Sequence, residues 1–66
     1  MNEVEIRLAV YLLIKQHGND AEYMARERAH TLLAAGDQLG CADFLKVARA
    51  IKALSPQKPR ESGGAN

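Results

Sequence analysis

The chain has 66 residues, with nine lysines and arginines against eight aspartates and glutamates, and its formal net charge of +1 supplies no overall positive field for nucleic acid or an anionic membrane. One cysteine excludes an intramolecular disulfide, and two histidines without clustered thiols argue against a structural zinc site. Because a chain this short buries only about 60% of its unfolded surface, self-association is the remaining means of stabilising the fold.

The first predicted helix spans residues 3–17. Glu3 and Glu5 fall in its first turn and Lys15 in its last turn, which is the charge order that the helix dipole favours. Gly18 then supplies a C-terminal stop. The apolar run over residues 8–14 leaves a β-strand as the alternative for that segment.

This predicted helix is apolar on more than one side. One stripe at helical spacing consists of Ile6, Ala9, Val10, Leu13 and His17. A second stripe consists of Val4, Leu8, Tyr11 and Leu12. A helix in a small monomer buries one stripe, so we expect a partner chain to cover the second. The alternative is that the two other helices wrap the first one and bury both stripes.

The second predicted helix spans residues 21–35, after a short turn in which Asn19 or Asp20 is the expected N-cap. Glu22 and Arg26 stand four residues apart and are expected to form a weak surface ion pair. Its apolar face comprises Ala21, Met24, Ala25, Leu32 and Ala35, with Ala29 and Thr31 at the edges.

The third predicted helix spans residues 38–54, because Gly36 can end the second helix and Asp37 can cap the next one. Asp43 and Lys46 are expected to pair weakly on its outer side. Its apolar face is the clearest in the chain and comprises Cys41, Phe44, Leu45, Val47, Ala48, Ile51 and Leu54.

The domain organisation follows from these elements. Residues 1–55 form one helical domain, and residues 56–66, with two prolines, two glycines and no large apolar side chain, are predicted to be a disordered tail. No apolar run is long enough to cross a bilayer, and the opening Met-Asn-Glu-Val-Glu lacks the basic start of a secretory signal. We therefore expect a cytoplasmic protein.

Candidate chemistry is sparse. His17, His30 and Cys41 lie on separate predicted segments without the spacing of metal ligands. We expect no catalytic residue, metal, cofactor or small-molecule substrate, and no enzymatic activity. One alternative is a reactive Cys41, because a helix N-terminus lowers the pKa of a thiol.

A second alternative is nucleic-acid binding through the basic residues of the third helix. Lys46, Arg49 and Lys52 lie outside its apolar face. The outer face that carries these three residues lacks the asparagine, glutamine or paired arginine that reading of base edges favours. A solvated charged face is therefore the simpler interpretation.

Two turns carry a resemblance. The residues concerned are His17-Gly18-Asn19-Asp20-Ala21, Arg28-Ala29, Leu32-Leu33-Ala34-Ala35-Gly36-Asp37, Gly40, Phe44, Ile51 and Leu54. With them the chain resembles, over most of residues 6–54, short uncharacterised bacterial helical proteins that have a His-Gly turn and an Ala-Gly-Asp turn. The resemblance implies a small helical protein and adds no site residue.

These observations predict an all-α protein, either a three-helix bundle or a helical hairpin plus an N-terminal helix, that forms a homodimer. The predicted function is a non-enzymatic protein–protein interaction module. Its predicted contact surface is the second stripe of the first helix, defined above, and its partner is a second copy or another protein.

Overall fold

The computed structural model describes residues 1–54, and their regular structure is entirely helical. The all-α prediction is confirmed, and the strand alternative for residues 8–14 is wrong. The predicted tail, 56–66, lies outside the described residues. The elements are α1 (Glu3–His17), the 3-10 turn η1 (Gly18–Asp20), α2 (Ala21–Ala34) and α3 (Gln38–Leu54).

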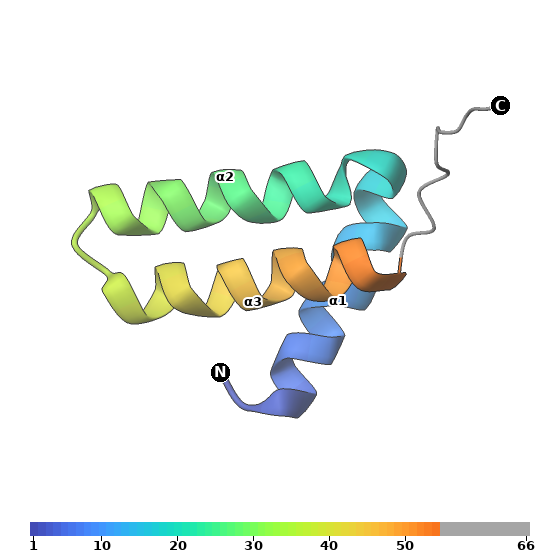
Figure 1. Ribbon diagram of the computed structural model, residues 1–66, viewed down its shortest axis with the longest axis horizontal. Coiled ribbons are helices and arrows are strands. Elements are labelled where there is room, and N and C mark those ends of the chain that lie inside the picture. Colours follow the sequence, from blue (N-terminus) through green and yellow to red (C-terminus); the bar gives the residue numbers. More distant parts are fainter. Residues whose placement is uncertain (55–66) are drawn as a thin grey trace, which may run out of the picture.

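Two helical units pack together as a hairpin. The first unit is a bent stretch of 32 residues in which α1, η1 and α2 follow one another directly, and the second is α3. Figure 1 shows α2 and α3 lying side by side in opposite directions, while α1 crosses α3 steeply. Most tertiary contacts join α2 to α3, and α1 makes far fewer with either.

A capping box begins α1. The Asn2 side chain accepts a hydrogen bond from the Glu5 amide at 2.8 Å, and the Glu5 carboxylate accepts one from the Asn2 amide at 3.1 Å. The Met1 amino group lies 2.9 Å from the Asp43 carboxylate. The predicted pair of Asp43 with Lys46 is therefore wrong, because the start of α1 takes up this carboxylate.

The bend between α1 and α2 forms at Gly18. This glycine has φ +57° and ψ −122°, and its amide donates to the Ile14 carbonyl, which ends α1. The predicted capping of α2 by Asn19 or Asp20 is wrong, since no side chain caps this helix. Carbonyls of η1 take that place, as when the Ala21 amide donates to the Gly18 carbonyl.

The turn between α2 and α3 is a Schellman motif. Gly36 has φ +87°, its amide donates to the Leu33 carbonyl at 3.0 Å, and the Asp37 amide donates to the Leu32 carbonyl at 2.8 Å. The Asp37 carboxylate in turn accepts from the Gly40 amide at 2.8 Å. Asp37 thus caps α3, as predicted, and its amide also takes part in closing α2.

The core lies where α1 and α2 meet α3. Its buried members are Val10, Ala21, Ala25, Val47, Ala48 and Ile51. Helix α2 contributes only fully buried alanines to the interior, including Ala29, and such small side chains let its backbone approach α3 closely. Leu54, predicted to complete the face of α3, is 65% exposed, because it lies at the end of α3 beside an open space that α1 does not fill.

Candidate interaction surface

The second apolar stripe of α1 is open to solvent. Val4 is 73% exposed, Leu8 55%, Tyr11 58% and Leu12 41%. We call these four residues the α1 face. The alternative in which α2 and α3 bury both stripes is wrong, and within residues 1–54 the α1 face is left uncovered.

The exposure of the α1 face follows from how α1 packs. On its inner side only Val10 is buried, while Ile6, Ala9 and Leu13 are partly buried against the core. Helices α2 and α3 fill their own interface and touch α1 on one side. The opposite side of α1 therefore has no helix among residues 1–54 to pack against.

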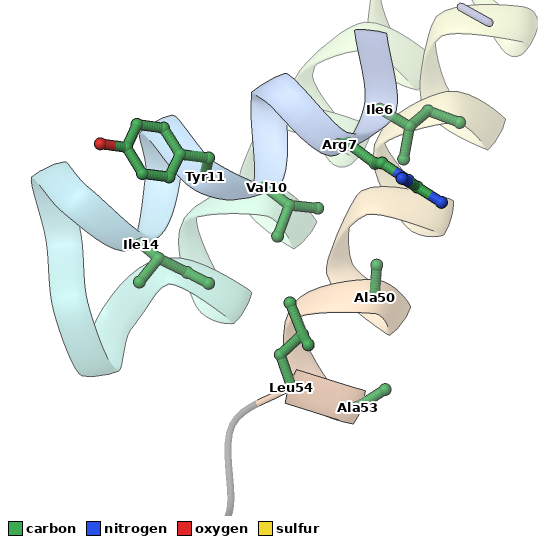
Figure 2. A pocket seen from close by; sticks show the side chains of 8 residues that line it. All are labelled: Ile6, Arg7, Val10, Tyr11, Ile14, Ala50, Ala53 and Leu54. Carbon is green, nitrogen blue, oxygen red and sulfur yellow. The ribbon is translucent and has the colours of Figure 1, made fainter. Parts of the chain in front are cut away.

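An open groove lies beside the α1 face, between α1 and the last turns of α3. Its volume is about 570 Å³, and its lining residues are Ile6, Arg7, Val10, Tyr11, Ile14, Ala50, Ala53 and Leu54. We call it the α1–α3 groove. Figure 2 shows Val10 and Ile14 on one wall and Ala50 and Leu54 on the other. Arg7 is the one charged residue in the lining.

The groove was not predicted from the sequence. Ala50 and Ala53 are too small to fill the space that opens as α1 crosses α3, and the direction of that crossing is a tertiary feature (Figure 2). The clue in the sequence was the pair of alanines on the side of α3 that carries Leu54.

Tyr11 joins the groove to the α1 face. It belongs to both, and the Lys15 ammonium lies 5.7 Å from the centre of its ring. That distance is within the range of a cation–π contact. A positive charge is thus held over the C-terminal part of an otherwise apolar surface.

A smaller and more polar cavity of about 300 Å³ lies on the other side of α1. It is lined by Ala9, Leu12, Leu13, Gln16, His17, Met24, Arg28 and Phe44. The Arg28 guanidinium sits 5.6 Å from the centre of the Phe44 ring and so stabilises the contact between α2 and α3. Because Leu12 lines this cavity, it belongs both to the cavity and to the α1 face.

The structure separates the other candidate residues. His17 lines the smaller cavity, His30 is exposed on α2, and Cys41 is buried as a free thiol. Among residues 1–54 no group of three or more histidine, cysteine, aspartate or glutamate side chains is placed to hold a metal ion. None of the helices in this part combines the length and apolar character needed to cross a membrane.

The basic residues of α3 form an exposed row. Lys46, Arg49 and Lys52 are all exposed, and within the described 54 residues none of them makes an ion pair. By contrast, Arg26 pairs with Glu22 at 3.0 Å on α2, as predicted.

Comparisons of the chain with known protein families, with curated proteins and with solved structures found no match.

Proposed function

We propose that this protein is a small, non-enzymatic helical module for protein–protein interaction, and that it forms a homodimer through the α1 face. The observation that carries the proposal is the exposure of Val4, Leu8, Tyr11 and Leu12 together on one side of α1. Contiguous apolar surface of this kind mostly marks interaction sites on soluble proteins. In the dimer, the three helices of each chain would join one larger bundle.

The size of the surface is consistent with a small interface. Ile14 and Leu54, at the edge of the α1–α3 groove, are 37% and 65% exposed and extend the α1 face. These two side chains and the four of the face expose on the order of 500 Å² in each copy, so that pairing would bury at most on the order of 1,000 Å² in total, about the least that a specific interface needs.

Self-association would also add stability that the small core does not provide. Within residues 1–54 the buried hydrophobic side chains are four alanines, two valines, one isoleucine and one cysteine, and a core this small gives limited stability. Because binding to the folded state stabilises it by mass action, a dimer would raise the free energy of unfolding in a concentration-dependent way.

Leu8→Glu tests the proposal. Leu8 is 55% exposed and lines neither cavity, so a charge there leaves the monomer's core intact but must be buried in the dimer without a partner, which is costly. We expect light scattering to show a dimer for the unmodified protein and a monomer for the variant, with nearly unchanged helical circular dichroism.

The matched control is Leu39→Glu. Leu39 is 81% exposed at the start of α3 and lies outside the α1 face, so this variant should keep the mass of the unmodified protein. A monomeric mass for the unmodified chain across a concentration series, or an unchanged mass in Leu8→Glu, would contradict self-association through α1.

The exposed row of Lys46, Arg49 and Lys52 favours one second candidate, a small nucleic-acid-binding regulator. Binding through such cations weakens steeply as the salt concentration rises. Replacement of all three residues by glutamine should abolish salt-dependent binding to duplex DNA if this second function is real. Absence of DNA binding by the unmodified protein at low salt would contradict this second function.

A further inference from the structure

We infer that the two copies of α1 pair antiparallel, about a two-fold axis that passes near Leu8 and Tyr11. The inference rests on the proposed self-association and specifies its geometry. The same patch then serves both partners, as two-fold symmetry requires. In this register Leu8 of one copy faces Tyr11 of the other, and Val4 of one copy faces Lys15 of the other.

The charges along α1 carry the orientation. Glu3 and Glu5 lie in its first turn and Lys15 in its last turn, and all three side chains are exposed. An antiparallel pair places Lys15 of each copy near Glu3 and Glu5 of the other. A parallel pair would place lysine beside lysine and glutamate beside glutamate, and such like-charge contacts select against an arrangement.

The position of Lys15 on the helix supports this register. Its ammonium lies over the Tyr11 ring, so the charge sits at the α1 face itself and not on the far side of the helix. Lys15 comes 11 residues after Val4, a separation of about 16 Å along the helix at 1.5 Å per residue. The apolar centre of the face lies between these two positions.

The residues that follow α3 are a weaker occupant for this surface. The α1–α3 groove opens beside Leu54, where residues 55–66 begin, but that segment contains no large apolar side chain. A second copy of the chain instead supplies the leucine, valine and tyrosine side chains that match an apolar surface.

Disulfide cross-linking distinguishes the two orientations. Val4→Cys and Lys15→Cys are prepared separately in a Cys41→Ala background, mixed, oxidised and analysed by mass spectrometry. Because a disulfide needs Cα atoms within about 7 Å, the antiparallel pair should give mainly the mixed product that joins position 4 to position 15. Leu39→Cys in the same background is the control and should cross-link to neither.

The outcomes separate this inference from the proposed function. A dimer by light scattering that yields mainly 4–4 and 15–15 disulfides would mean a parallel pair and would overturn the inference alone. A dimer that yields no cross-link of these kinds would overturn the register. A monomer at every concentration would contradict the proposed function as well.

Charge reversal gives an independent test without cysteines. In the antiparallel pair, Lys15→Glu should weaken dimerisation about tenfold, since two ion pairs become repulsive. Adding Glu3→Lys to the same chain should restore most of the affinity, although both changes oppose the helix dipole. Lys52→Glu on α3 is the control. An unchanged dissociation constant for Lys15→Glu would contradict the orientation.

Discussion

The α2–α3 hairpin and α1 use apolar residues in opposite ways. Helix α2 faces α3 with Ala21, Ala25 and Ala29, each fully buried, and these small side chains allow the two backbones to come close. Helix α1 carries larger apolar side chains, such as Leu8 and Tyr11, and leaves them exposed. The comparison shows that mutual fit, more than apolar content, decides which helices of this chain bury their surface.

The same contrast appears at the turns. A Schellman motif followed directly by the Asp37 cap connects α2 to α3, so the hairpin is closed by hydrogen bonds local in sequence. The bend after α1 has one glycine and no side-chain cap. Local interactions thus define the hairpin connection more strongly than they define the position of α1.

Replacing one isoleucine in each region should give the largest difference. Ile51 is 2% exposed within the hairpin core, whereas Ile14 on α1 is 37% exposed and borders the groove. Ile51→Ala should lower the free energy of unfolding by about 2–5 kcal/mol because it leaves a cavity. Ile14→Ala should cost less than about 1 kcal/mol.

Urea unfolding followed by circular dichroism, at one low protein concentration, measures both isoleucine variants. The concentration must be constant because self-association shifts the apparent stability. Equal losses at the two positions would mean that α1 is as tightly packed as the hairpin.

Enlarging one alanine in each region should have a moderate effect. Ala25 is fully buried between α2 and α3, so Ala25→Leu should destabilise the protein by about 1–3 kcal/mol through overpacking. Ala9 on α1 lines the smaller cavity, which has room for the added atoms, and Ala9→Leu should change stability by no more than about 0.5 kcal/mol. Thermal unfolding of the two variants measures both losses. A larger loss for Ala9→Leu than for Ala25→Leu would contradict the prediction.

Glycine substitutions at the two turns should give the smallest difference between the two regions. Gly36→Ala should cost about 1–2 kcal/mol, since this site has φ +87°. Gly18→Ala should cost about 1–3 kcal/mol, since φ +57° with ψ −122° is a backbone conformation that only glycine adopts readily. Asparagine tolerates the left-handed helical region, so Gly36→Asn should cost clearly less. Gly18→Asn should destabilise the protein as much as Gly18→Ala does, because ψ −122° lies outside that region. Similar unfolding midpoints for the two asparagine variants would contradict this difference.

The sequence was sufficient for most of the features that depend on neighbouring residues. Helices α1 and α3 have the bounds expected from hydrophobic periodicity, and α2 ends one residue early, at Ala34. The cap at Asp37 and the pair of Glu22 with Arg26 were also predicted, since each joins groups three or four residues apart. The capping box at Asn2 was missed although its pattern was present.

Two errors arose where a residue's partner or cover comes from elsewhere in the chain, whereas the wrong N-cap of α2, at Asn19 or Asp20, was an error in a local feature. Asp43 binds the amino group of Met1 and not Lys46. Leu54 is exposed because none of the helices in residues 1–54 covers it. Periodicity shows which side chains share a face of a helix, but it carries no information about which neighbour reaches that face.

The sequence by itself determined three amphipathic helices and the turns that join α2 to α3, because periodicity, capping and glycine placement act over a few residues. Only the tertiary structure decided whether α2 and α3 cover one or both of the apolar stripes of α1, and where a groove opens. That choice depends on the crossing of α1 over α3 (Figure 1), which is set by how side chains distant in sequence fit together. The uncovered stripe, with Leu8 and Tyr11 at its centre, is the surface for which we propose a second copy of the chain.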